Sequence, residues 1–216
     1  NLPDVYFQVV MARDANNNLV HTGVYVGDDL ETYLTAARAS RSQNITMFDK
    51  PVQKIVAVMQ ADEFRATWVA NKAVYRTRMA MADGGELLVI APGVERFGEQ
   101  PEVEALIRKY GYRPRTEILE LYKQNADMRE TAHGTAHLIH GTSDRRFTIR
   151  YAPGKLSKAE IESVHYEYAD VNEMLERYHP SRMREGWNTM PDGEEVFYIS
   201  TPSAGLWSTR ERLMSR

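Results

Sequence analysis

The sequence predicts an α/β domain with a Rossmann-like, mostly parallel sheet flanked by helices, and with an N-terminal β-hairpin extension. The sheet is predicted from two short, almost continuous apolar runs at 55–59 and 87–91, which are typical of strands buried on both faces. A long helical stretch separates them, and a strand, a helix and a strand in this order form a right-handed βαβ unit. The hairpin is predicted from two β-rich runs near the N-terminus.

These two runs cover residues 5–12 and 19–26. In the first, apolar side chains occupy every odd position from Val5 to Met11, which is the period-two pattern of a half-buried strand. The Asn-rich connector at 14–18 has the composition and length of a hairpin loop.

The remaining elements follow from periodicity and capping signals. Asp29 is expected to cap a helix that runs to about residue 39, and the long helix at 62–82 is expected to end at Asp83-Gly84-Gly85. Further helices are predicted at 102–109, 115–124, 129–139, 158–164 and 171–177, and further strands at 147–151 and 195–200. We expect a single domain, 1–216, with a sub-boundary near residue 50.

Composition and motifs exclude several classes of protein. The 27 basic and 30 acidic residues give a net charge of −3 and form no basic stripe, so nucleic acid is not an expected partner. The absence of cysteine excludes a disulfide-stapled scaffold and thiolate metal sites. No G-x-G-x-x-G motif or phosphate loop is present. No apolar run approaches the ~20 residues that span a bilayer, so a cytoplasmic protein with no membrane partner is expected.

The predicted helix at 62–82 carries the main candidate site. At about 100° per residue, one face collects three cations and one aromatic, which are Arg65, Trp68, Lys72 and Arg76. The helix would start at the carboxyl end of the strand at 55–59, where open α/β sheets bind ligands. We expect a small carboxylate or phosphate to bind this face. The alternative is a solvated helix face.

Three histidines form a second candidate. His133, His137 and His140 are spaced four and three residues apart, which places them on one face of a helix. Histidines four apart can bind zinc or nickel, but the zinc-protease pattern is not present. A helix C-terminal turn before Gly141 explains the same residues without a ligand. Lining of a cleft is therefore preferred to metal binding.

Two segments also resemble a known family. Residues 62–72 contain Trp68-Val-Ala-Asn-Lys72, and residues 83–92 contain Gly84-Gly85 before a strand. They resemble the carboxy-terminal half of the nickel-dependent lactate racemase family, in which an aromatic-Gln-Ala-x-Lys stretch opens a helix and a Pro-Gly-Gly turn leads into the next strand. The segments 84–98, 137–141 and 192–200 resemble an uncharacterised branch of that family more closely.

The resemblance implies a two-domain enzyme that racemises 2-hydroxy acids by transient hydride transfer to a nickel pincer nucleotide. The amino-terminal half of such enzymes carries this cofactor and the catalytic histidines, so this chain alone is expected to be catalytically incomplete and to bind no cofactor or metal. The family's lysine falls on Lys72 and its aromatic on Trp68. Its glutamine falls on Val69, which argues against lactate itself as the substrate. By a looser alignment, His133 matches a family histidine.

The sequence thus predicts the substrate-binding, C-terminal domain of a nickel-pincer-nucleotide-dependent 2-hydroxy acid racemase or epimerase. Its expected partners are the missing N-terminal domain, a small 2-hydroxy acid-like carboxylate and further copies of the chain in a homo-oligomer. The residues expected to bind the substrate are Arg65, Trp68, Lys72, Arg76, His133, His137 and His140. Two alternatives stay open: a free-standing module that binds a small carboxylate or a nucleotide, and an assembly domain whose cationic face packs on a partner subunit.

Overall fold

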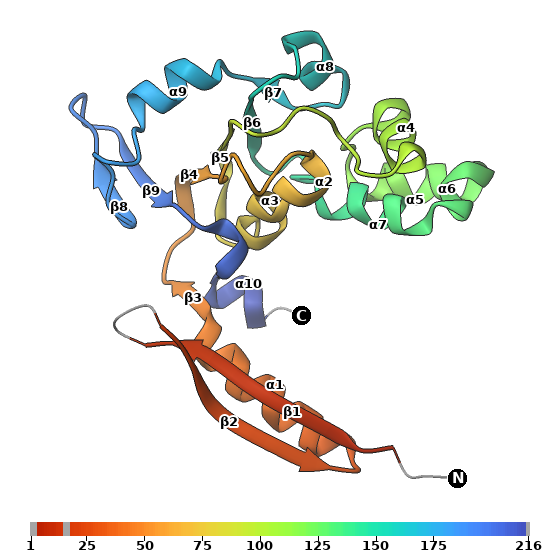
Figure 1. Ribbon diagram of the computed structural model, residues 1–216, viewed down its shortest axis with the longest axis vertical. Coiled ribbons are helices and arrows are strands. Elements are labelled where there is room, and N and C mark those ends of the chain that lie inside the picture. The colour runs from red at the N-terminus through yellow and green to blue at the C-terminus, as the bar shows by residue number, and fades with distance from the viewer. Residues whose placement is uncertain (1–3, 15–17, 215–216) are drawn as a thin grey trace. The chain divides into compact units, whose positions relative to one another are not determined.

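The structure is a computed structural model that describes all residues except 1–3, 15–17 and 215–216 (Figure 1). The chain divides into two compact units, Asn1–Thr46 and Met47–Arg216. The division lies close to the sub-boundary expected near residue 50. Among the described residues, no helix has both the length and the apolar character that crossing a bilayer requires.

The first unit is the predicted hairpin followed by one helix. β1 (Tyr6–Arg13) and β2 (Leu19–Gly27) pair in antiparallel fashion, and α1 (Leu30–Asn44) runs beyond its predicted end near residue 39. Asp29 caps α1 as expected, since its carboxylate accepts the N–H of Thr32 at 2.8 Å. Three residues of the predicted loop, 15–17, lie outside the described residues.

The apolar face of the hairpin is exposed. Phe7 and Val9 are 65% and 45% exposed, and their cross-strand partners Val26 and Val24 are each 60% exposed. The helix α1 instead covers the opposite face, where the Tyr6 ring lies 6.0 Å from that of Tyr33. The period-two pattern therefore identified the strand, but the side chains that it marks as apolar lie outward. Such a contiguous apolar surface is typical of a region that another domain or partner covers.

The second unit contains the predicted sheet, with six strands in the order β7-β6-β5-β4-β9-β8. Every neighbouring pair is parallel except β8–β9, so the mostly parallel α/β fold is confirmed. The strands are β4 (Val52–Val58), β5 (Met81–Ala91), β6 (Thr148–Pro153), β7 (Glu167–Tyr168), β8 (Gly186–Thr189) and β9 (Glu195–Ile199). The short strands β3 (Ile45–Phe48) and β10 (Leu206–Thr209) lie outside this sheet.

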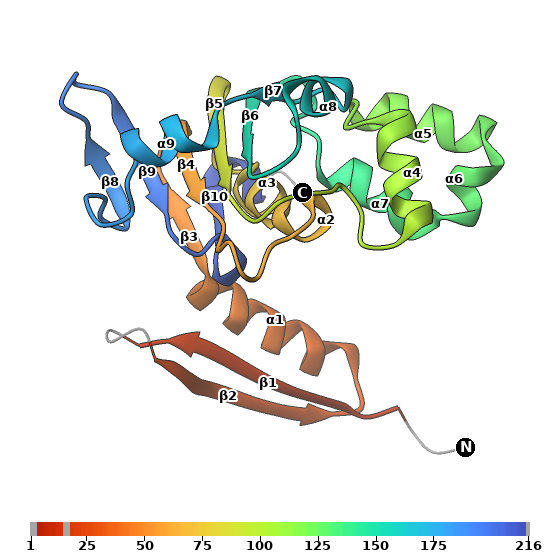
Figure 2. The ribbon, with the colours of Figure 1, turned by 45° about the horizontal axis from the view of Figure 1, so that its top comes forward.

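Helices flank the sheet, and alternate residues of the central strands face two separate cores. Leu87 and Val89 of β5 belong to the larger core, whereas Leu88 and Ile90 belong to the smaller one. Figure 2 shows α4–α7 gathered beyond the β6 side of the sheet. The helices are α2 (Thr67–Ala70), α3 (Lys72–Thr77), α4 (Pro101–Tyr110), α5 (Arg115–Gln124), α6 (Ala126–Glu130), α7 (Ala132–His140), α8 (Lys158–Ser163), α9 (Val171–Arg177), α10 (Arg210–Met214) and the 3-10 helix η1 (Pro202–Ala204).

The prediction of one long helix at 62–82 is wrong. Residues 61–63 form a turn, α2 and α3 are separate short helices, and β5 already begins at Met81. The helix starts late because Ala66 bridges to Arg96 as extended backbone. Gly84 and Gly85 lie inside β5 rather than at a helix end, and Gly84 has a φ of +77°, which favours glycine.

The helix predicted at 129–139 is likewise two helices. Thr131 separates α6 from α7 and has φ −105° and ψ 55°, which is not helical. The other predicted helices and strands of this unit are confirmed with small differences at their ends, except that β5 begins six residues before the strand predicted at 87–91.

Candidate functional site

The loops that leave β4, β5 and β6 meet at the carboxyl edge of the sheet and pack backbone to backbone. A Cβ on Gly93 would lie 2.2 Å from the carbonyl oxygen of Ala61, and one on Gly154 would lie 1.9 Å from that of Pro92. Both distances are far inside van der Waals contact, so only glycine allows this approach. Open α/β sheets bind ligands at this edge.

Four charged side chains from these loops form what we call the edge cluster: Arg65, Glu95, Arg96 and Lys155. The Glu95 carboxylate lies 2.7 Å from Lys155 Nζ, 3.1 Å from Arg96 Nη1 and 3.7 Å from Arg65 Nε. The hydrogen bond from Lys155, and then the charge of Arg65, lower the pKa of Glu95. Three cations around one ionised carboxylate leave an excess of two positive charges, which favours an anion at this edge.

Next to the edge cluster, two buried polar residues anchor the segment that contains Trp68 and Lys72. Thr67 Oγ1 lies 3.0 Å from the carbonyl oxygen of Phe97, and Asn71 Nδ2 donates to the Tyr166 hydroxyl at 2.9 Å. Thr67 and Asn71 are four residues apart and both are fully buried. Trp68 and Lys72 are also four residues apart, each one position after Thr67 and Asn71. They therefore share the side of this helical segment next to the buried one, and both are half-buried.

A buried chain of hydrogen bonds extends from this anchor to α7. His137 Nε2 lies 2.9 Å from the Tyr112 hydroxyl, which lies 2.8 Å from Thr67 Oγ1. Each hydroxyl in this chain has both a donor and an acceptor when His137 carries its proton on Nε2. His137 then donates to Tyr112, Tyr112 donates to Thr67, and Thr67 donates to the Phe97 carbonyl. Burial lowers the pKa of His137 to about 3, so the imidazole is neutral and serves as a donor that ties α7 to α2.

The structure brings three of the predicted site residues together. The Trp68 ring lies 4.7 Å from the His137 ring and 5.9 Å from that of His133. His133 is exposed and hydrogen-bonds to Gln100 at 3.1 Å. His140, at the end of α7, has its ring 6.0 Å from that of Tyr75.

Of the three cations of the predicted helix face, Arg65 is separated from Lys72 and Arg76, which lie four residues apart within α3. Arg65 belongs to the edge cluster, before α2 begins. Arg76 donates to the Gly205 carbonyl at 3.1 Å and so holds η1. Arg65 therefore does not share a helix face with Lys72 and Arg76, because the helix begins only after it.

Lys72 is the most distinctive of these cations. It is half-buried, and its ammonium lies 5.6 Å from the ring centre of Phe64, a fully buried residue of the loop after β4. Among the described residues no carboxylate forms an ion pair with it. A partly desolvated ammonium without a counter-ion favours an anionic ligand.

The described side chains do not fit a nickel site. Among them, no group of three or more metal-binding side chains is close enough to hold a metal ion. His137 is buried and engaged with Tyr112, whereas His133 is exposed. This part of the chain therefore provides no ligand set for the nickel of the pincer cofactor.

Sequence reasoning missed Glu95, Arg96 and Lys155, although the sequence carries a signal for them. The tripeptide Ala-Pro-Gly ends both β5, at 91–93, and β6, at 152–154. The repeated turn marks the same edge of two neighbouring parallel strands, and the charged residues follow it directly.

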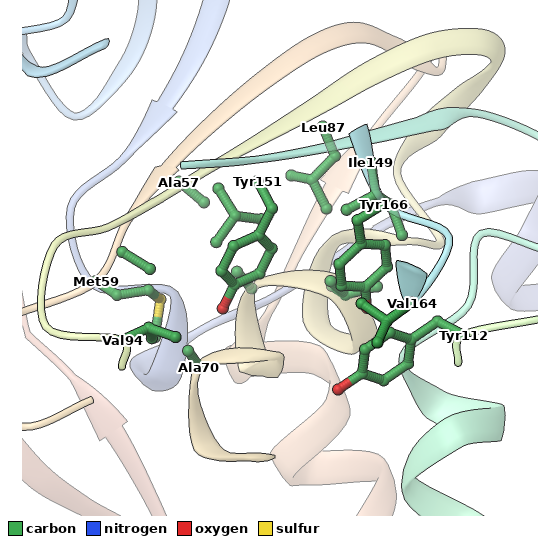
Figure 3. Close-up of a cluster of buried hydrophobic side chains, with 14 of the residues drawn as sticks. Ala57, Met59, Ala70, Leu87, Val94, Tyr112, Ile149, Tyr151, Val164 and Tyr166 are labelled. Carbon is green, nitrogen blue, oxygen red and sulfur yellow. The ribbon is translucent and has the colours of Figure 1, made fainter. Parts of the chain in front are cut away.

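Three stacked tyrosines lie in the core beside Asn71, and the hydroxyl of one of them makes no hydrogen bond to the described residues. The ring of Tyr166 is parallel to those of Tyr112, at 4.4 Å, and Tyr151, at 5.5 Å. Figure 3 shows them among the apolar side chains of the larger core. Among the described residues the buried Tyr151 hydroxyl has no hydrogen-bond partner.

We expect Tyr151→Phe to raise the free energy of unfolding by about 1 kcal/mol, because it removes a buried, unpaired hydroxyl. Urea unfolding followed by circular dichroism measures this. Tyr166→Phe is the matched control, and it should lower the stability, since the Tyr166 hydroxyl bonds to Asn71 and donates to the Gly141 carbonyl at 2.7 Å. A loss of stability in Tyr151→Phe would contradict the prediction.

Comparison with known proteins gives a fold relationship only. No protein family model and no curated protein matches the sequence. The structure of a Thermotoga maritima protein, solved by a structural genomics consortium, superimposes with a TM-score of 0.68 and 20% sequence identity. The match covers 95% of this chain and 49% of the Thermotoga maritima chain. The structure of the lactate racemase apoprotein from Thermoanaerobacterium thermosaccharolyticum superimposes with a TM-score of 0.58 and 11% sequence identity. The match covers 94% of this chain and 46% of the lactate racemase chain. The chain thus spans about half the length of each structure.

Proposed function

We propose that this chain is the substrate-binding, carboxy-terminal half of a two-domain 2-hydroxy acid racemase or epimerase. In this proposal the other half of the enzyme holds the nickel pincer nucleotide and performs the hydride chemistry. The role of this chain is to bind and orient the substrate carboxylate.

The observation that carries the proposal is the setting of Lys72. Its ammonium is half-buried, lies over the Phe64 ring and has no carboxylate partner among the described residues. The buried side chains of Thr67 and Asn71 fix the backbone on both sides of Trp68. A rigidly held cation beside an aromatic wall suits a small carboxylate, whose binding adds a charge-assisted hydrogen bond.

Two further observations support a role as half of an enzyme. The fold matches lactate racemase over 94% of this chain but only 46% of that protein, which leaves room for a second domain. In addition, the edge cluster keeps an excess of positive charge at the carboxyl edge of the sheet. The glutamine of the family motif is Val69 here, so the proposal is a 2-hydroxy acid other than lactate.

The proposal predicts that Lys72→Ala in the intact protein raises KM at least about tenfold, or abolishes turnover, on its 2-hydroxy acid substrate, because a charge-assisted hydrogen bond is lost. Racemisation is followed by chiral chromatography with a panel of 2-hydroxy acids. Lys123→Ala is the matched control, since Lys123 is exposed and pairs with Glu120, and the kinetics of this variant should be unchanged. Normal kinetics in a folded Lys72→Ala variant would disprove the assignment.

A free-standing binding module makes a different prediction. A ligand stabilises the folded state of such a module by mass action. The isolated 216-residue chain would therefore show a rise in Tm that increases with the concentration of lactate or malate. Half of a two-domain site should respond weakly, because its pocket is open. The thermal shift of the isolated chain therefore separates the two functions.

A further inference from the structure

One face of the hairpin is exposed and apolar, and we call it the apolar sheet face. Paired residues of an antiparallel sheet point to the same side, so Phe7 and Val9 lie beside their cross-strand partners. Leu19 lies on this side too, because its partner Arg13 is six residues after Phe7 along β1. Figure 2 shows α1 along the opposite side of the hairpin. The exposed apolar residues of the face are Phe7, Val9, Leu19, Val24 and Val26.

The unit that carries this face has a very small core. Among its described residues, the buried apolar side chains are those of Val10, Ala12 and Ala36. A unit as small as Asn1–Thr46 usually depends on a disulfide, a structural metal or association with another surface. The chain has no cysteine, and the described residues form no group that could hold a metal ion. Association through the apolar sheet face is the remaining source of stability.

The area of the apolar sheet face matches the lower limit of a specific interface. Five large apolar side chains at the exposures of this face present on the order of 500 Å² to solvent. Two copies that stack face to face would therefore remove about 1,000 Å² from water, which is the least that a specific protein–protein interface needs. A second hairpin also offers a surface of the same size and of the same pleated shape.

The charges of the two strands also permit a second copy. From Tyr6 to Ala12 and from Leu19 to Gly27 the sequence contains no Lys, Arg, Asp or Glu. In a symmetric dimer, residues near the twofold axis lie close to their own counterparts, so a charge there would meet a like charge. An axis that crosses the strands at the Val9–Val24 pair avoids this, because Arg13 lies at one end of the strands and is kept away from the other copy's Arg13.

We propose that the apolar sheet face is the interface of a twofold-symmetric homodimer of this chain. The two hairpins stack about 10 Å apart with their strands roughly aligned, as the sheets of a β-sandwich do, and each α1 lies on the outside. The proposal concerns a different unit from the one that carries Lys72. It therefore stands whether or not the chain binds a 2-hydroxy acid.

The test measures the mass of the full 216-residue chain by sedimentation equilibrium at concentrations from about 1 to about 100 μM. We expect the mass to rise from 24.8 kDa to twice this value and no further. Phe7→Thr keeps a β-branched residue in the strand but removes an apolar side chain from both copies, so it should weaken the dimer about 100-fold. Val26→Thr should weaken it in the same way, and it tests the interface even if Phe7→Thr does not fold.

Leu119→Gln is the matched control, because Leu119 is an exposed leucine of α5 in the other unit. This variant should dimerise as the original chain does. A mass of 24.8 kDa at every concentration would overturn the proposal, and it is the result expected if the other half of the proposed enzyme covers the face instead. Growth beyond two copies, an unchanged affinity in the folded Phe7→Thr or Val26→Thr variant, or an equal loss in Leu119→Gln would overturn it as well.

Discussion

Gly154→Ala is expected to lower the free energy of unfolding of the second unit by about 3 kcal/mol. The added methyl group would lie 1.9 Å from the Pro92 carbonyl oxygen, and a backbone atom cannot rotate away as a flexible side chain does. The loops after β5 and β6 would have to separate, which would break the bond from the Gly154 N–H to the Ala91 carbonyl, 3.1 Å long. Urea unfolding of the full chain, followed by tryptophan fluorescence, measures the change.

Lys155→Ala is the control for this substitution, because it alters the same loop without narrowing the backbone approach. Lys155 is 71% exposed, and loss of its ion pair with Glu95 should change the stability by less than about 1 kcal/mol. A Gly154→Ala variant as stable as Lys155→Ala would mean that the loops separate easily. In that case the edge cluster would not be held rigidly.

The central strands of the sheet could be predicted because burial on both faces leaves a purely local signal, whereas the short strands β7 and β8 were missed. β4 and β5 show this signal as unbroken apolar runs. β1, a strand of the hairpin, was predicted instead from its period of two. The sequence of β1 itself carries no signal for which of its two faces is covered, because this depends on where α1 packs. The late start of α2 could not be predicted from the neighbouring residues either, since it depends on the bridge between Ala66 and Arg96, which are thirty residues apart.

The candidate site was predictable to the same extent. Trp68 and Lys72 share a side because a spacing of four survives even in two short, consecutive helices. Glu95 and Lys155 reach Arg65 only through the order of the strands, which single-sequence periodicity does not encode.

Acid should destabilise the second unit through His137. The pKa of His137 falls from its ordinary value of 6.5 to about 3 in the folded chain. Above pH 6.5 the imidazole is neutral in both states and contributes no pH dependence. Below it the unfolded chain binds a proton that the folded chain does not, so the free energy of unfolding falls by up to about 1.4 kcal/mol per pH unit. The total by pH 3 is about 4–5 kcal/mol.

Carboxylates also contribute to acid unfolding, so the measurement compares slopes. Urea unfolding between pH 7 and 4 should give a shallower fall of stability for His137→Gln, whose amide keeps a donor near Tyr112 but does not titrate. His133→Gln, an exposed neighbour on the same helix, should keep the slope of the original chain. An unchanged slope in His137→Gln would mean that His137 is protonated in the folded chain. The imidazolium would still donate from Nε2 to Tyr112, so the chain of bonds to Thr67 would persist, but α7 would have to open far enough for water to solvate the charge.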